Sequence, residues 1–117
     1  MKSLHLHIDE TEVPISWQDN RSVAALMQLA ADQPLIISAS RYGGFEQVGP
    51  LGQRIVSDDV QTATTPGDVV LYSGNQIVVF FGTNSWSYTR LGHVDLSEAQ
   101  LKELLDKDNV LITISQQ

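Results

Sequence analysis

The chain has 117 residues, of which 42% are hydrophobic and 18% charged, so it fits a single domain, residues 1–117. Its formal net charge of −7 disfavours nucleic acid and anionic membranes as partners, because both carry negative charge. The absence of Cys excludes disulfides, thiolate metal sites and cysteine nucleophiles. The start of the chain is unlike a signal peptide, and no apolar run reaches the roughly 18 residues that span a bilayer, so we expect a cytoplasmic protein.

The first elements predicted are two strands that form a β-hairpin. Apolar and polar residues alternate over residues 4–8 and again over residues 13–17, on either side of a polar connection. Pro14 lacks an N–H group, so the second strand is expected at an edge, or with its first residues outside the pairing.

A helix is predicted next, with Asp19 or Asn20 as its N-cap and Pro34 beyond its end. Residues 35–40 then form a short apolar strand. The paired glycines within residues 41–46 release the backbone from ordinary limits, and we interpret this segment as a functional loop. The apolar face of the helix consists of Val23, Leu26, Met27 and Ala30.

Residues 49–65 are rich in Pro, Gly and small polar residues, which predicts irregular structure with short strand pieces. Pro and Gly at the centre of residues 65–68 predict a type II turn. A hairpin follows, in which Gly74 and Asn75 connect strands at residues 69–72 and 76–81.

The segment 77–93 is the most informative part of the chain. Its first five residues are apolar and include β-branched and aromatic side chains, which predicts a strand that is covered on both faces. Beyond Gly82 we expect a loop in which Trp86, Tyr88 and Arg90 offer planar faces and hydrogen-bond donors to a ligand.

Ser97 and Gln100 then form a capping-box pattern ahead of a second amphipathic helix that carries Leu101, Leu104 and Leu105. Residues 110–114 predict a final strand. Several short strands with hairpin turns and only two helices indicate a mostly β protein, built as a closed or nearly closed antiparallel barrel, because closure removes exposed strand edges.

Four groups of residues resemble the cyclophilin-like domains of bacteria, the small single-domain group. They are Asp19-Asn20 with Ser22 and Ala24, Tyr42-Gly43-Gly44 with Glu46, Pro66-Gly67-Asp68, and the run from Trp86 to Gly92. The resemblance implies a closed eight-stranded antiparallel β-barrel with two short capping helices. Members of that group are sometimes fused to a flavodoxin-like module, which implies a flavodoxin-like protein as one possible partner.

The sequence also departs from the prolyl isomerases that share this fold. It has neither their Phe-His-Arg strand, whose Arg polarises the prolyl amide, nor their downstream Phe-Gly-Gly-Asp-type segment. Phe80-Phe81 resembles the paired phenylalanines that floor the proline pocket. Efficient isomerase activity is therefore not expected, although a loop arginine, Arg41 or Arg90, offers a substitute cation.

We predict a ligand pocket formed by Tyr42, Glu46, Phe81, Trp86, Tyr88 and Arg90. In the structural alternative, Trp86 and Phe81 fill the barrel, while Arg90 forms an ion pair with Glu46 that holds two loops together. Glu46 is a candidate general base or ligand-orienting carboxylate if it is desolvated, but in a polar loop it is more often an ion-pair partner.

His5 and His7 have the i, i+2 spacing of metal ligands on a strand, and His93 is a candidate third ligand. Solvent-facing histidines explain the same pattern more simply, and we predict neither a metal nor a cofactor. The favoured function is binding of a small molecule or an extended peptide. The alternatives are a weak prolyl isomerase and an interaction module that works with a flavodoxin-like partner.

Overall fold

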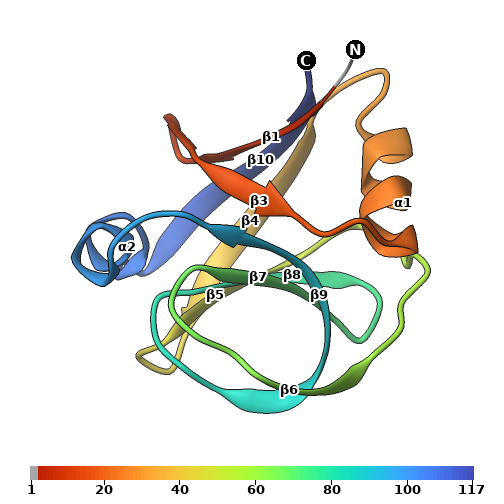
Figure 1. Cartoon of the computed structure of the whole chain (residues 1–117). Helices are drawn as coiled ribbons and strands as arrows, with labels where there is room; N and C mark the ends of the chain where they lie inside the picture. The colour runs from red at the N-terminus through yellow and green to blue at the C-terminus, as the bar shows by residue number, and fades with distance from the viewer. Residues whose placement is uncertain (1–2) are drawn as a thin grey trace.

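Ten strands and two helices form residues 3–117, the part of the chain that the computed structural model describes (Figure 1). In chain order they are β1 (Leu4–Ile8), β2 (Thr11–Val13), β3 (Ile15–Trp17), α1 (Arg21–Leu29), β4 (Leu35–Tyr42), β5 (Glu46–Pro50), β6 (Val60–Ala63), β7 (Asp68–Tyr72), β8 (Gln76–Phe80), β9 (Ser85–Val94), α2 (Glu98–Leu105) and β10 (Asn109–Gln116). All the strand pairs among these residues are antiparallel. The prediction of a mostly β protein with two helices is confirmed.

The strands form a nearly closed barrel. Nine of them follow the hydrogen-bonded order β2-β1-β10-β4-β5-β8-β7-β9-β3, and β6 pairs with β9 outside this order. The first and last strands of the order, β2 and β3, are consecutive in the chain, and only Pro14 separates them. This bent segment therefore joins the two ends of the sheet. Counted as one strand, it reduces the nine strands to the eight that the resemblance implies.

Pro14 is the residue at which this segment changes its partner. Before Pro14 the chain pairs with β1, and after it the chain pairs with β9. Pro14 has no N–H to donate, but its carbonyl accepts a hydrogen bond of 2.9 Å from the N–H of Asp95. The prediction of an edge position is confirmed, because β2 and β3 are the two ends of the strand order and pair on one side, with β1 and β9 respectively.

The barrel interior is filled by apolar side chains from alternate strand positions, and a helix lies on either side of it (Figure 1). Leu26 of α1 and both Leu101 and Leu105 of α2 are fully buried in the same core cluster as the strand residues. Each helix therefore closes the barrel with its apolar face. Within the described residues, neither helix is long and apolar enough to cross a membrane.

Both helices begin where their caps predict. The side chain of Asn20, and not that of Asp19, accepts a hydrogen bond of 2.9 Å from the N–H of Val23. The side chains of Ser97 and Gln100 each bond the other residue's backbone N–H, which completes the predicted capping box. These bonds satisfy N–H groups that the first turn of a helix leaves without partners.

A second apolar cluster covers the face of β7 and β8 that points away from the barrel interior. Along β8, Ile77 and Val79 belong to the interior, while Val78 and Phe80 belong to this outer cluster. The prediction of a strand buried on both faces is thus confirmed. The outer cluster also contains Val70 and Tyr88, with Phe45, Val48 and Tyr72 packed against it.

The predicted type II turn is present before β7. Gly67 has φ of +102°, and the N–H of Asp68 bonds the carbonyl of Thr65 at 3.0 Å. A side chain at Gly67 would place its Cβ only 2.6 Å from the carbonyl oxygen of Val94. Glycine is therefore required here both by the backbone conformation and by the approach of β9.

Of the two predicted loops, one is a hairpin turn flanked by strand residues and the other is part of a strand. Residues 41–46 form the tip of the hairpin between β4 and β5, in which Tyr42 pairs directly with Glu46. Trp86, Tyr88 and Arg90 belong to the ten-residue strand β9, because its first half pairs with β6 and its second half with β7. Aromatic and β-branched residues favour such pairing, which explains why this segment is a strand.

Candidate functional site

A cavity of about 530 Å³ lies on the outer face of the barrel, against β5 and β8. Four of the six predicted site residues, Tyr42, Glu46, Trp86 and Tyr88, line it. The remaining lining residues are Phe45, Val48, Tyr72, Gln76 and Asn84. Phe81 and Arg90 are not among them.

The register of the sheet explains why these residues meet. Glu46 lies opposite Phe80, and Val48 lies opposite Val78, so β5 and β8 present these side chains on the same face. Tyr72 and Gln76 are opposite each other at the end of the β7–β8 hairpin. The floor of the cavity is therefore formed by strand residues whose side chains point away from the barrel interior.

The first half of β9 supplies the facing wall. Trp86 and Tyr88 of β9 are two residues apart, which is the spacing that places strand side chains on one face, and both line the cavity together with Asn84, which immediately precedes β9. The ring of Tyr88 lies over the floor, with its centroid 5.7 Å from that of Phe80 and 6.0 Å from that of Tyr72. Both contacts have the edge-to-face geometry that aromatic pairs prefer.

The rim of the cavity is aromatic and open to solvent. Trp86 is 57% exposed and Tyr42 is 64% exposed, although both are large apolar rings. The rings of Tyr42 and Phe45 stand perpendicular to each other, with centroids 6.0 Å apart. Exposed aromatic rings around a concavity are typical of binding sites, because a ligand can cover them.

Glu46 places a carboxyl group in this aromatic surface. The residue is only 6% exposed, and within residues 3–117 no hydrogen bond or charge acts on its carboxyl group beside burial. Burial raises the pKa of Glu46 from 4.5 to about 7. The carboxyl group therefore changes its charge near neutral pH, inside a cavity that supplies no cation of its own.

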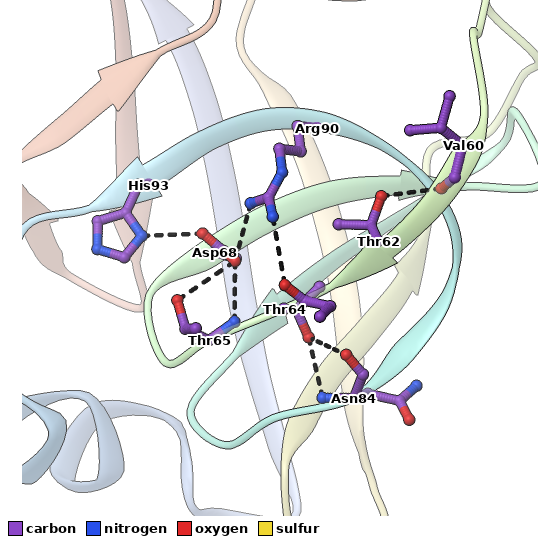
Figure 2. A network of polar contacts seen from close by, with 9 residues as sticks. Val60, Thr62, Thr64, Thr65, Asp68, Asn84, Arg90 and His93 are labelled. Carbon is purple, nitrogen blue, oxygen red and sulfur yellow. Dashed lines mark hydrogen bonds and ion pairs between the residues drawn. The ribbon is translucent and has the colours of Figure 1, made fainter.

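Arg90 pairs with Asp68, and not with Glu46 as the structural alternative predicted. Figure 2 shows that Arg90 and His93 point toward the same carboxylate, that of Asp68. The hydrogen bonds measure 3.0 Å from Arg90 and 2.9 Å from the Nδ1 atom of His93, and the N–H of Thr65 adds another at 2.9 Å. The guanidinium also donates to the carbonyl of Ala63 at 3.3 Å. It is held outside the cavity by these contacts.

The meeting of Arg90 and His93 at Asp68 reflects an irregularity of β9. Val69 pairs with Gly92 but Val70 pairs with Arg90, so Leu91 is an extra residue on β9. This bulge changes the alternation beyond Leu91, because Leu91 and Val94, three residues apart, both belong to the interior cluster, while Arg90 and His93 both point to Asp68. A strict period of two continued from Trp86 does not describe both halves of the strand.

A second polar network connects the wall of the cavity to the segment before β7. The hydroxyl of Thr64 donates a hydrogen bond of 2.9 Å to the carbonyl of Asn84 and accepts one of 3.0 Å from its N–H (Figure 2). The side-chain amide of Asn84 in turn donates to the hydroxyl of Tyr88 at 2.8 Å. Tyr88 is therefore held in place by both packing and hydrogen bonding.

Phe81 lies in the barrel core and not in the cavity, which corrects the prediction for this residue. It is 1% exposed and belongs to the interior cluster, whereas its neighbour Phe80 belongs to the outer cluster beneath Tyr88. Adjacent residues of an extended chain point to opposite faces. The same alternation, applied to the apolar run, could have selected Phe80 from the sequence.

The other candidate cation, Arg41, is also engaged elsewhere. Its guanidinium forms ion pairs with Asp106 at 2.8 Å and with Asp108 at 3.1 Å. It points to the region that follows α2, and it does not line the cavity.

The three histidines do not come together. His5 contacts Glu12, with Nδ1 2.6 Å from a carboxylate oxygen, and His7 is 4.0 Å from the same side chain. His93 instead pairs with Asp68, and their strands β9 and β7 lie far from β1 in the order of the sheet. In the part of the chain described, no group of three or more His, Cys, Asp or Glu residues is arranged to hold a metal ion.

The sequence analysis missed five lining residues: Phe45, Val48, Tyr72, Gln76 and Asn84. Two signals pointed to some of them. Residues that flank the predicted turn at Gly74 and Asn75 must face each other, and Asn84 continues the alternation of Trp86 and Tyr88. Phe45 and Val48 depend on the pairing of β5 with β8, which the sequence does not specify.

The chain matches the family model described as "Cyclophilin-like family" over residues 6–115. The match therefore extends from β1 to β10 and includes every residue that lines the cavity. No curated protein matches the chain.

Proposed function

This chain belongs to the cyclophilin-like family, and from the cavity on its barrel we propose that it binds a small molecule or part of an extended peptide. The observation that carries the proposal is a concave site in which five aromatic rings surround a buried carboxyl group without a partner among residues 3–117. A cavity of about 530 Å³ lies within the range of roughly 300–1,000 Å³ that is usual for ligand pockets.

The composition of the lining supports binding rather than simple packing. An aromatic surface gives affinity by burying apolar area, and a few polar groups fix the orientation of the ligand. Here the polar groups are Glu46, Gln76 and Asn84. A solvent-exposed Trp86 at the rim has no structural partner in the aromatic pairs of the described residues, so covering it with a ligand is favourable.

A prolyl isomerase is less well supported. That chemistry needs a cation that hydrogen-bonds the prolyl nitrogen while an apolar surface holds the ring. Arg41 and Arg90 are the two candidates, and both are paired with aspartates outside the cavity. The interaction with a flavodoxin-like protein rests on the resemblance alone, and no contact or surface described above favours it.

Binding can be tested by NMR with the protein's own two tryptophans as reporters. The indole of Trp86 lines the cavity, while that of Trp17 donates to the carbonyl of Leu4 elsewhere in the barrel. A library of small fragments, neutral and charged, is titrated into ¹⁵N-labelled protein. We expect selective shifts of the Trp86 indole and of the Glu46 and Tyr72 amides.

Two variants complete this test. Trp86→Ala should abolish the fragment-induced shifts of the other cavity residues. Val60→Ala is the matched control, because Val60 is an equally exposed apolar residue on the paired strand β6 but does not line the cavity. The proposal is wrong if no fragment shifts the cavity residues, or if Trp17 responds as strongly as Trp86.

A further inference from the structure

We propose that the ligand of this cavity carries an organic cation, such as an alkylated ammonium group, which the aromatic rings enclose and Glu46 neutralises. The inference rests on the proposed function, because it names the chemical class of the ligand for the same site. The cation could belong to a free small molecule or to the side chain of a methylated lysine in a peptide.

The rings of the cavity are arranged as walls that meet at steep angles. Tyr42 and Phe45 are inclined at 89° to each other, and Tyr72 and Tyr88 at 63°. Trp86 adds a further exposed ring at the rim. The face of an aromatic ring carries negative charge density and attracts a cation within about 6 Å of its centre, and several faces around one space act together.

Glu46 adds a full negative charge to this surface when it is ionised. A carboxylate removed from water is strongly destabilised unless a cation or hydrogen-bond donors accompany it. None of the nine lining residues is Lys, Arg or His. An incoming cation would therefore supply the partner that the described part of the chain does not give to Glu46.

The rest of the molecule favours the same class of ligand. The formal net charge of −7 attracts cations and repels anions at long range. The two candidate arginines, Arg41 and Arg90, are paired with aspartates and do not offer a site for an anion in the cavity. A bulky alkylated cation also suits an apolar lining better than a small, strongly hydrated one.

Choline and its neutral isostere 3,3-dimethylbutan-1-ol provide the direct test, since they have the same shape and differ in charge. Each is titrated into ¹⁵N-labelled protein at pH 8 while the Trp86 indole signal is followed. Choline should bind at least about tenfold more tightly than the alcohol. Glu46→Gln, which keeps the size of the side chain, should remove most of this preference, whereas Glu103→Gln on the exposed face of α2 should leave it unchanged.

Binding of choline should also weaken at acidic pH. The titratable groups that line the cavity beside Glu46 are the phenols of Tyr42, Tyr72 and Tyr88. Because burial raises the pKa of Glu46 to about 7, only about one tenth of the free protein has the carboxylate at pH 6, so the affinity should be about tenfold lower than at pH 8. Glu46→Gln should remove this dependence.

A trimethyllysine peptide, compared with the same peptide carrying unmodified lysine, distinguishes the two sources of the cation. Much tighter binding of the trimethylated peptide than of choline identifies a peptide ligand, and equal binding identifies a free small molecule; both outcomes support an organic-cation site. The inference is overturned if the alcohol binds as well as choline, or if neither shifts the Trp86 indole. Fragment binding at the cavity under those conditions would leave the proposed function intact, so the two failures are distinguishable.

Discussion

Arg90 on β9 and Asp68 on β7 form an ion pair in which the guanidinium is 43% exposed and the carboxylate is almost completely buried, with 3.0 Å between Nη1 and Oδ2. The same carboxylate accepts hydrogen bonds from His93 and from the N–H of Thr65. Asp68 therefore holds together β7, the turn before it and the second half of β9. The first half of β9 contains Trp86 and Tyr88, which form part of the cavity wall. The contacts of Asp68 therefore stabilise the strand that forms the site, although Asp68 does not line the cavity itself.

We predict that Asp68→Asn lowers the free energy of unfolding at pH 7 by about 1–3 kcal/mol, because Arg90, His93 and the N–H of Thr65 lose an ionised acceptor. Chemical denaturation monitored by circular dichroism measures this change. Asp58→Asn is the matched control: Asp58 also pairs with an arginine, Arg21, but both side chains are largely exposed, and the expected change is under about 0.5 kcal/mol. Equal effects of the two substitutions would contradict the role given to Asp68.

The stability that Asp68 provides should disappear in acid. Burial alone raises the pKa of Asp68, but hydrogen bonds from His93, Thr65 and Arg90 outweigh it, so the pKa is lowered from the usual 3.8. The folded protein therefore binds this proton less tightly than the unfolded chain does, and the stability is present above pH 3.8 and is lost as the pH falls below it. The difference in unfolding free energy between wild type and Asp68→Asn should shrink over that range, and a constant difference would argue against it.

The contribution of Glu46 to the free energy of unfolding should decrease as the pH rises, whereas that of Asp68 decreases as the pH falls. Its pKa rises from 4.5 to about 7 on folding, so between these values the folded protein holds a proton that the unfolded chain releases. Stability from this group is complete below pH 4.5 and is lost as the pH rises through 7, by an amount on the order of 2 kcal/mol. Glu46→Gln should be more stable than wild type at pH 8 and equally stable at pH 4. Urea denaturation at both pH values checks this, and an unchanged difference between them would exclude the raised pKa.

Substitutions of Phe80 and Phe81 should have similar effects on stability but different effects on ligand binding. Both rings are fully buried, so Phe80→Leu and Phe81→Leu should each cost about 1 kcal/mol of unfolding free energy. Of these two rings, Phe80 packs against Tyr88 and Phe81 belongs to the interior cluster, so only Phe80→Leu should alter the affinity of fragments that shift the Trp86 indole. A larger effect on binding from Phe81→Leu would show that the interior, and not the outer face, holds the ligand.

Efficient prolyl isomerisation is not expected from this site. An aromatic surface that holds proline without polarising its nitrogen binds ground state and transition state alike, and such binding does not raise the rate. A protease-coupled assay on an Ala-Pro peptide should give a rate close to the uncatalysed one for wild type, Arg41→Ala and Arg90→Ala. Robust turnover that either substitution abolishes would establish the isomerase alternative.

The local features of this protein could be predicted from the sequence because short-range chemistry decides them. Asn20 and Ser97 cap helices through bonds to residues three positions away, and Gly67 permits a turn that closes within four residues. Turn chemistry and apolar runs also indicated a mostly β barrel with two helices. Tyr42, Glu46, Trp86 and Tyr88 were selected as site residues because aromatic and charged side chains beside glycines stand out in the sequence, and the structure brings these four around one cavity.

Tertiary structure alone decided which face each strand residue occupies and which charges meet. The bulge at Leu91 changes the alternation along β9, so His93 as well as Arg90 reaches Asp68, a residue 25 and 22 positions away from them in the chain. The pairing of β5 with β8 sets Glu46 opposite Phe80, a relation between residues that no local pattern connects. The pairing of charges and the register of strands depend on contacts between distant segments. The interaction energies that select one pairing or one register arise only when those segments pack together.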